Sequence, residues 1–215
     1  MPKRLIAFGC SFTYGHGLED CFIPPDRAGQ FPSAYAWPVL LSRRLFRFCV
    51  NKSYPGNSNK AIWWNIVNFE YEPEDIVVVL WSLPTRDCVI EQDSTHPRSL
   101  RSLFPLYDHH TNGKHYRKWL FNDNAFSELD FKIESHLSIS HADAYLKSKN
   151  IKVYHLLHRK ENYDPFPKWQ TTKFETREFY GETWSDLGLD GNHPGPKSHK
   201  QLADDLYKII QGENK

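Results

Sequence analysis

The sequence predicts an α/β fold, a three-layer α/β/α sandwich built around a parallel sheet. Two patterns indicate it. Apolar runs without helical period recur along the chain and end in small or polar residues, and segments with helical spacing separate these runs. Such alternation is typical of parallel strands joined by right-handed crossovers. A length of 215 residues is enough for one domain with its own core, so we predict a single domain over residues 1–215.

Four apolar runs are predicted to be the strands of this sheet. They span residues 3–8, 46–51, 76–80 and 151–157. The third run consists of five consecutive aliphatic residues, most of them β-branched. A run of this kind is typical of a central strand that is buried on both faces.

Four segments have apolar residues at helical spacing and are predicted to be helices, over residues 34–45, 60–69, 124–149 and 197–210. Pro38 is compatible with a helix only near its start, and Ser58 or Asn59 is expected to cap the second helix. Apolar residues predict the buried stripes of the last two helices: Phe126, Leu129, Ile133, Leu137, Ala144 and Tyr145 in the third, and Leu202, Leu206, Ile209 and Ile210 in the fourth.

The segments between these elements are predicted to be irregular. Residues 12–31 are expected to form a long loop, and residues 88–123 an irregular insertion that lines a site or forms a lid. Residues 163–189 are rich in aromatic residues and are expected to cover the site, with a short fifth strand in part of the segment. The histidines of the insertion, His109, His110 and His115, are expected to be loop residues, because no carboxylate or cysteine completes a metal-binding pattern.

Ser11 is the first candidate for chemistry. It follows the first predicted strand in the sequence Gly9-Cys10-Ser11, at the carboxyl end of a strand, where ligands bind in open α/β sheets. A serine in such a turn can expose its hydroxyl and direct its own N–H at a developing oxyanion. Cys10 is a rival nucleophile, but a buried thiol far from positive charge stays protonated.

Asp190 and His193 are the second candidate pair. They are three residues apart, just before the last predicted helix, so the carboxylate can orient the imidazole within one short loop. This arrangement supplies the base and its orienting acid for a serine nucleophile.

Together the two ends of the chain resemble the SGNH (GDSL-like) hydrolase family, whose fold is flavodoxin-like. Gly9-Cys10-Ser11 resembles the family's first block with Cys in place of Asp, and Asp190-Gly191-Asn192-His193 matches its last block. The glycine of the second block is matched by Gly56. The third block, Gly-x-Asn-Asp, is absent, and Trp81-Ser82-Leu83-Pro84-Thr85-Arg86 stands in its place.

The resemblance implies Ser11 as nucleophile, His193 as general base and then acid, and Asp190 as its orienting group. It also implies that the N–H groups of Ser11 and Gly56 stabilise the oxyanion. The side-chain donor that the third block would supply is missing. Five residues are candidates to replace it: Ser82, Thr85, Arg86, Asn57 and Asn59.

Composition excludes several classes of function. The net charge of +1 gives no general attraction to nucleic acid or to a membrane surface, and no apolar run reaches bilayer length. The four cysteines are scattered, which argues for reduced thiols and against a disulfide framework or a zinc site. We therefore expect a cytoplasmic protein without a cofactor, metal, nucleic-acid partner or membrane partner.

The function that these features predict is ester hydrolysis by acyl transfer to Ser11 and then to water. The aromatic content of 15% favours a small ester, such as an O-acetylated carbohydrate, over a long acyl chain. Two alternatives remain open: a non-catalytic ligand- or carbohydrate-binding protein on the same fold, and a phosphate- or nucleotide-handling protein. Activity is expected to rise with pH over roughly 6 to 8, where an imidazole loses its proton.

Overall fold

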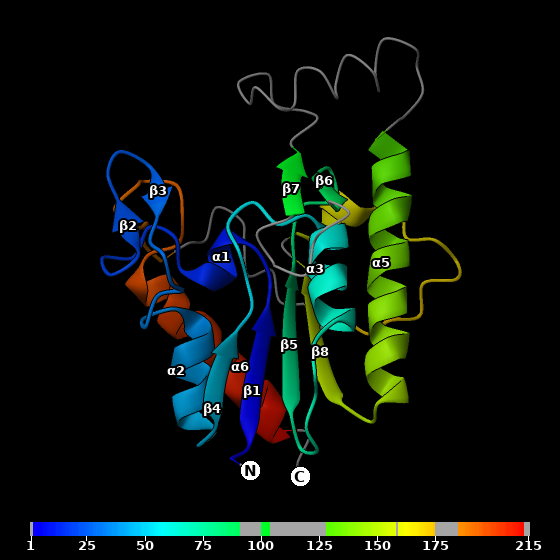
Figure 1. Cartoon of the computed structure of the whole chain (residues 1–215), viewed down its shortest axis with the longest axis horizontal. Coiled ribbons are helices and arrows are strands. Elements are labelled where there is room, and N and C mark those ends of the chain that lie inside the picture. Colours follow the sequence, from blue (N-terminus) through cyan, green and yellow to red (C-terminus); the bar gives the residue numbers. More distant parts are fainter. Residues whose placement is uncertain (1, 91–99, 104–127, 158, 175–184, 213–215) are drawn as a thin grey trace.

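The computed structural model describes residues 2–90, 100–103, 128–157, 159–174 and 185–212. These residues form one parallel sheet with helices on both faces, as Figure 1 shows. The predicted α/β class is therefore confirmed. None of the described helices is both long enough and apolar enough to cross a membrane.

The sheet has four strands in the order β4–β1–β5–β8, all parallel: β1 (Arg4–Phe8), β4 (Phe48–Asn51), β5 (Ile76–Trp81) and β8 (Lys152–Leu157). All four predicted strands are thus present. The second begins two residues later than predicted, and Phe46, just before it, has a left-handed backbone with φ 51°.

Central β5 separates two halves of the hydrophobic core. Its six residues are all buried, and successive side chains point to opposite faces. Ile76, Val78 and Leu80 join one cluster with the apolar side of α6. The alternate residues of β5 join a second cluster with residues of α3 and α5. The continuous aliphatic run therefore marks a strand that is covered on both sides, as predicted.

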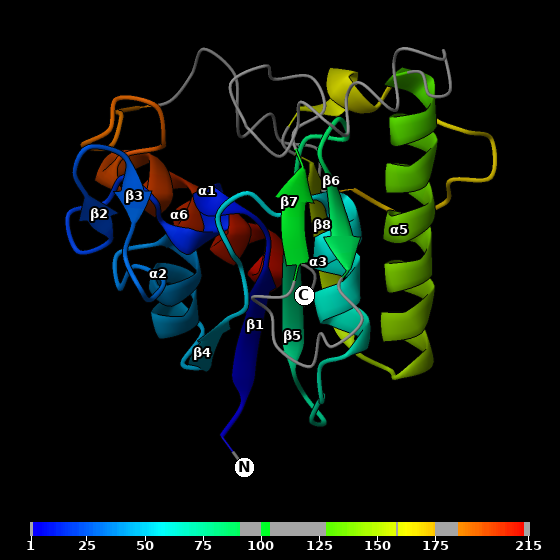
Figure 2. The same cartoon turned by 45° about the horizontal axis from the view of Figure 1, so that its top comes forward.

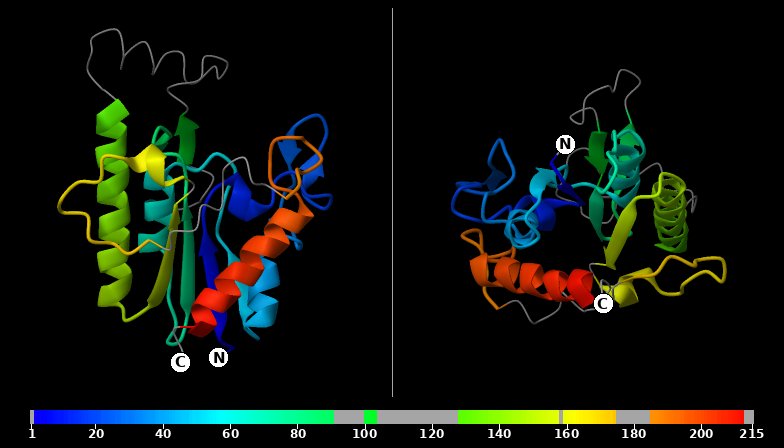
Figure 3. Two further views of the ribbon diagram at one scale, coloured as in Figure 1. Left: turned by 180° about the vertical axis from the view of Figure 1, so that it is seen from behind. Right: turned by 90° about the horizontal axis from the view of Figure 1, so that it is seen from below.

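Helices pack on both faces of the sheet: α2 (Trp37–Arg44) and α6 (Pro196–Gly212) on one, α3 (Asn59–Val67) and α5 (Glu128–Ser148) on the other. Figure 3 shows α6 crossing the face opposite to α5. Pro38 lies in the first turn of α2, and the hydroxyl of Ser58 accepts a hydrogen bond from Ala61 N–H, which caps α3.

The predicted buried stripe of α5 is mostly wrong, because Tyr145 is its one described member that packs against the core. Leu129, Ile133 and Leu137 are exposed, and residues 124–127 lie outside the described residues. The helix instead buries a mixed face that contains three polar residues, each with a hydrogen-bond partner: Phe131, Ser135, His136, Ile139, Ala142, Asp143 and Leu146. The prediction used only the spacing of apolar residues, so it could not identify a buried face whose polar side chains form hydrogen bonds. The stripe of α6 was predicted better, because Leu202, Leu206 and Ile210 are buried.

The prediction of a loop over residues 12–31 is also wrong in part. One helical turn, α1 (Ser11–Tyr14), begins directly after β1, and β2 (Phe22–Ile23) pairs with β3 (Arg27–Ala28). The carbonyl of Cys10 accepts hydrogen bonds from the N–H groups of Thr13 and Tyr14. Elements this short contain no apolar period that a sequence pattern can reveal.

The two remaining irregular segments are partly described. Within 88–123, β6 (Asp87–Ile90) pairs with β7 (Leu100–Leu103), so this part is regular, and the histidines from His109 to His115 lie outside the described residues. Within the described part of 163–189, Phe174 forms an isolated parallel bridge with His155 on β8, and the expected fifth strand is not formed. A short 3-10 helix, η2 (Lys160–Tyr163), precedes it.

Candidate active site

Ser11 is the first residue of α1 and lies just past the carboxyl end of β1. The turn that places it there requires a glycine at position 9, because a Cβ on Gly9 would collide with the side chain of Thr13. Ser11 is buried, with 5% of its surface exposed. The turn therefore places this residue at the sheet edge where ligands bind in open α/β folds.

Asp190 and His193 form a hydrogen-bonded pair in the loop before α6. The Nδ1 of His193 donates to Oδ2 of Asp190 at 2.5 Å. The backbone N–H groups of Asn192 and His193 both donate to Oδ1 of Asp190, each at 3.0 Å. Burial of Asp190 opposes its ionisation, but these hydrogen bonds outweigh burial and lower the pKa of the carboxyl. Asp190 is thus an ionised acceptor that fixes the orientation of the His193 ring. With Nδ1 donating to Asp190, the lone pair of His193 is on Nε2, which makes no hydrogen bond within this loop.

The loop containing this pair is packed on the segment that follows Ser11. The N–H of Leu189 donates to the carbonyl of Gly17 at 2.8 Å. A Cβ on Gly188 would lie 2.7 Å from that carbonyl oxygen, and a Cβ on Gly17 would lie 2.9 Å from Oδ1 of Asp190. Figure 2 shows the loop before α6 beside α1 and the β2–β3 pair. Two parts of the chain more than 170 residues apart therefore meet at this edge.

A ring contact also joins the two parts, because the ring centroids of Phe12 and His193 are 5.4 Å apart. Phe12 is the residue next to Ser11. Within the described residues no hydrogen bond joins Ser11 to His193, and the Nε2 of His193 has no partner. In unliganded enzymes such catalytic hydrogen bonds are often long and tighten when substrate binds.

His16 is a site residue that sequence reasoning missed. Its ring lies against that of His193, with centroids 4.3 Å apart and planes 33° apart. His16 is only 8% exposed, and its Nε2 has no hydrogen-bond partner, although Oδ1 of Asp26 is 3.7 Å away. Burial, followed by the charge of His193, lowers the pKa of His16. No sequence signal marks this residue, because it lies in a segment without periodicity and its partner is remote in the sequence.

The second block reaches the same strand end. Gly56 has φ +80°, a left-handed conformation that favours glycine. The next residue, Asn57, is buried, and its Nδ2 donates to the carbonyl of Gly9 at 3.0 Å. Asn57 is therefore tied to the turn that presents Ser11.

Asn59 and Ser82 lie deeper, inside a hydrogen-bonded cluster under the end of β5. The Oδ1 of Asn59 accepts from the N–H of Ser82 at 2.8 Å. The Nδ2 of Asn59 is within hydrogen-bond distance of Ser135 Oγ and Tyr163 OH, at 3.0 Å each. Tyr163 also donates to the carbonyl of Ser82, and burial raises its pKa. Asn59 and Ser82 are enclosed by protein, so their position supports the strand end and offers no direct contact with a substrate.

Arg86 and Thr85 are closer to the surface and are half-buried. The Nη1 of Arg86 donates to Oγ of Ser82 at 3.0 Å, so the guanidinium is attached to this cluster. Two of the five candidates for the missing side-chain donor are therefore better placed than the others. Asn57 is hydrogen-bonded to the turn before Ser11, and Arg86 is held by Ser82 and lies nearer the surface.

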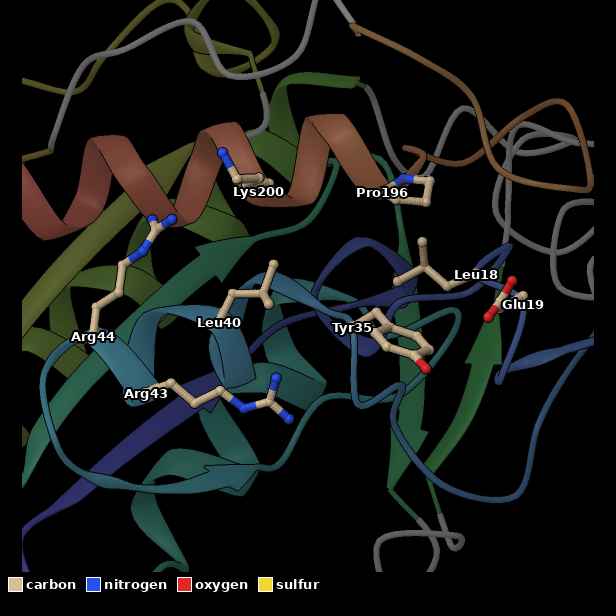
Figure 4. A pocket seen from close by; sticks show the side chains of 8 residues that line it. All are labelled: Leu18, Glu19, Tyr35, Leu40, Arg43, Arg44, Pro196 and Lys200. Carbon is tan, nitrogen blue, oxygen red and sulfur yellow. The ribbon is translucent and has the colours of Figure 1, made fainter.

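A cavity of about 580 Å³ opens beside the site, between α2 and α6. Figure 4 shows its lining side chains, which come from these helices and from the segment after α1: Leu18, Glu19, Tyr35, Leu40, Arg43, Arg44, Pro196 and Lys200. Its lining is largely apolar, with cations from both helices and the carboxylate of Glu19. Asp204 pairs with two of the cations, Arg44 and Lys200. Leu18 follows Gly17 directly, so the cavity begins next to the Asp190–His193 loop.

The sequence and the structure were compared with those of known proteins. No family model and no curated protein matches the sequence. Solved structures do match over nearly the whole chain. A lipolytic protein of the G-D-S-L family from Desulfitobacterium hafniense has TM-score 0.52 and 14% identity, with 96% of this chain and 99% of that chain covered. A carbohydrate acetylesterase from Sinorhizobium meliloti, Est24, has TM-score 0.56 and 10% identity, with 98% and 99% covered.

An acetyl xylan esterase from Butyrivibrio proteoclasticus has TM-score 0.59 and 13% identity, and the match covers 98% of this chain but only 64% of that protein. At these identities the likeness establishes the fold. The chain thus has the fold of the SGNH (GDSL-like) hydrolases, and the resemblance predicted from its motifs is confirmed at that level.

Proposed function

We propose that this protein is a serine esterase that transfers an acyl group to Ser11 and then to water. The observation that carries the proposal is the packing of the Asp190–His193 loop against the segment that begins with Ser11. Leu189 donates to Gly17, and the ring of Phe12 contacts that of His193. An ionised acid, an imidazole with a free Nε2 and a serine at a strand end are the groups that acyl transfer requires.

In the first half of the proposed reaction, Oγ of Ser11 attacks the ester carbonyl carbon while Nε2 of His193 takes the hydroxyl proton. The imidazolium is stabilised by Asp190. The N–H groups of Ser11 and Gly56 donate to the oxyanion. Collapse of the tetrahedral intermediate breaks the ester C–O bond, and the leaving alcohol receives the proton from His193.

In the second half, His193 takes a proton from water, whose oxygen attacks the acyl carbon on Ser11. The intermediate collapses, Oγ of Ser11 regains the proton from His193, and the carboxylic acid leaves. The sum of both halves is hydrolysis of one ester bond by one water molecule, without a cofactor.

For the substrate we propose a small ester such as an O-acetyl group on a carbohydrate. Among the proteins of similar fold are a carbohydrate acetylesterase and an acetyl xylan esterase. The exposed ring of Tyr35 also lines the cavity between α2 and α6, and such a ring is suited to stack on sugars and other planar or apolar faces.

A fluorophosphonate probe tests the nucleophile directly, because it attaches to an activated serine and is detected by intact mass. Wild type should gain one adduct, and Ser11→Ala should gain none. Cys10→Ala is the matched control one residue away, and it should label like wild type because Cys10 is buried. Hydrolysis of p-nitrophenyl acetate should fall about a thousandfold or more in Ser11→Ala. Equal rates in Ser11→Ala and wild type would contradict the esterase proposal and leave the non-catalytic alternatives standing.

The missing side-chain donor can be located with two further variants. Asn57→Ala and Arg86→Ala each remove one candidate, and loss of an oxyanion donor typically lowers kcat by about 100- to 1000-fold. Thr85→Ala removes a third candidate while Asn57 and Arg86 stay in place, and it completes the series. We expect the larger loss in kcat from Asn57→Ala, because its side chain is tied to the Ser11 turn through the carbonyl of Gly9.

A further inference from the structure

Three side chains at the Ser11 edge lie close enough together to share one cation. A ring nitrogen of His16, a ring nitrogen of His193 and a carboxylate oxygen of Asp190 are all within 4.8 Å of one another. Among the described residues this is the one group of histidine, cysteine and acidic side chains with that property. Two imidazoles and a carboxylate form a donor set that is typical of zinc.

The histidines are held in place by different parts of the chain. His16 follows α1, and His193 lies in the loop before α6, yet their rings are 4.3 Å apart between centroids. This spacing also depends on Gly17, where a Cβ would lie 2.9 Å from Oδ1 of Asp190 and 3.1 Å from the Cβ of His193. In tetrahedral zinc sites the ligand atoms are about 3.3 Å apart, so side-chain movements of about 1 Å would complete the group.

One ring nitrogen of His16 is buried without a hydrogen-bond partner. The residue is 8% exposed, and its Nε2 is buried without a hydrogen bond. An orphaned polar atom of this kind costs stability unless something binds to it.

We propose that His16, His193 and Asp190 form a binding site for a divalent transition-metal cation such as Zn²⁺, and that occupation of the site inhibits the esterase reaction. The carboxylate of Asp26, whose Oδ1 is 3.7 Å from Nε2 of His16, is positioned to serve as a further ligand. The sequence predicted a chain without metal, and this proposal departs from that expectation.

The inhibition follows from which atoms the cation occupies, and it rests on the proposed function. If the cation binds Nε2 of His193, it takes the lone pair that would accept the Ser11 proton. If it binds Nδ1, it displaces the hydrogen bond to Asp190 that fixes the ring. Either mode removes the general base, and a chelator restores it.

Calorimetric titration with ZnCl₂ tests the site without reference to catalysis. Wild type and Ser11→Ala should each bind one Zn²⁺ with equal affinity, because Ser11 is not a ligand. His16→Gln should bind at least about tenfold more weakly. His141→Gln is the matched control: His141 is exposed and remote, where it accepts a hydrogen bond from Trp63, and its loss should change nothing. Mg²⁺, which prefers oxygen ligands, should not bind.

Imidazole NMR of the wild-type protein gives a second measurement that does not depend on folding of His16→Gln. Zn²⁺ should shift the ring resonances of His16 and His193 and leave those of buried His155 in place. The esterase rate with and without Zn²⁺, compared within each variant, should show a strong loss in wild type and a loss at least about tenfold smaller in His16→Gln.

Two results would overturn the proposal. One is equal Zn²⁺ affinity in wild type and His16→Gln, which would place the binding at other histidines. The other is no stoichiometric binding in Ser11→Ala and wild type alike. Failure of the esterase proposal looks different, because Zn²⁺ binding would then persist while wild type and Ser11→Ala hydrolyse esters equally.

Discussion

Among the described residues, two Asp–His pairs are joined by a hydrogen bond, and comparing them shows what makes such a pair available for chemistry. His193 and Asp190 lie in one loop at the sheet edge, 2.5 Å apart. His155 on β8 and Asp143 on α5 lie in the interior, with His155 Nε2 3.2 Å from Asp143 Oδ1. Both pairs are a histidine oriented by a carboxylate, the arrangement that sequence motifs associate with catalysis.

The difference lies in the second ring nitrogen. In the buried pair, Nδ1 of His155 accepts from the indole N–H of Trp81 at 3.1 Å, so both ring nitrogens are used. Burial lowers the pKa of His155. Burial opposes ionisation of Asp143 too, but hydrogen bonds from His155 and Lys147 outweigh it and lower its pKa to about 2. This pair therefore stabilises the interior, whereas among the described residues Nε2 of His193 has no hydrogen-bond partner and stays available for the proton transfer that we propose.

The largest expected effect is the loss of the edge histidine. His193→Ala should lower kcat for p-nitrophenyl acetate by about a thousandfold or more, because it removes the base. Its melting temperature should stay near that of wild type, since His193 is near the surface. Near wild-type turnover in His193→Ala would contradict this comparison, because Nε2 of His193 would then have no role in catalysis.

Asp190→Asn should follow, with a loss in kcat of about a hundredfold or more at neutral pH. An amide keeps the shape of the side chain but can donate to Nδ1 and so favour the wrong tautomer of His193. Steady-state kinetics with folding checked by circular dichroism measures this. Asp186→Asn is a control in the same segment: Asp186 accepts from the N–H groups of Lys197 and Ser198, so its loss should affect stability more than turnover.

The buried pair should show the opposite pattern. His155→Phe leaves the indole N–H of Trp81 and the carboxylate of Asp143 without this partner, and we expect a loss of about 3 kcal/mol in the free energy of unfolding. Urea denaturation measures it. The control is His141→Phe, because His141 accepts from Trp63 in the same way but at the surface, and it should cost less than about 1 kcal/mol. Equal losses in both variants would contradict the assignment.

The smallest effect is a pH dependence of stability that comes from buried histidines. Burial lowers the pKa of His199 to about 4, while the unfolded chain has the ordinary value near 6.5. Between these values the unfolded state binds a proton that the folded state does not, so stability is full above about pH 6.5 and falls as pH drops toward 4.

For His199 alone, acidification from pH 7 to pH 5 should cost about 2 kcal/mol. His199→Gln, whose side-chain oxygen can still accept from the N–H of Trp37, should have a correspondingly shallower pH profile. Urea denaturation at the two pH values decides this. Parallel profiles of wild type and His199→Gln would assign the acid sensitivity to other groups.

Much of the fold could be predicted from local pattern. The aliphatic run of β5 and the alternation of strands with helices specified the parallel sheet, and the glycine turn after β1 located Ser11. The α5 stripe was predicted wrongly because Ser135, His136 and Asp143 are buried with partners that only the folded chain supplies. His16 was missed for the same reason: it belongs to no sequence motif or periodic segment, and its contact with His193 forms only in the folded chain.

The sequence by itself determined the strands, the layers and the two motifs that suggest acyl transfer, because apolar period and turn residues act over short stretches of chain. Only the tertiary structure decided which histidine keeps a free nitrogen, that His16 lies against His193, and that Asn59 and Ser82 are enclosed. These properties depend on contacts between residues far apart in the chain. Burial and hydrogen-bond partners at such contacts are set by the packing of the whole molecule.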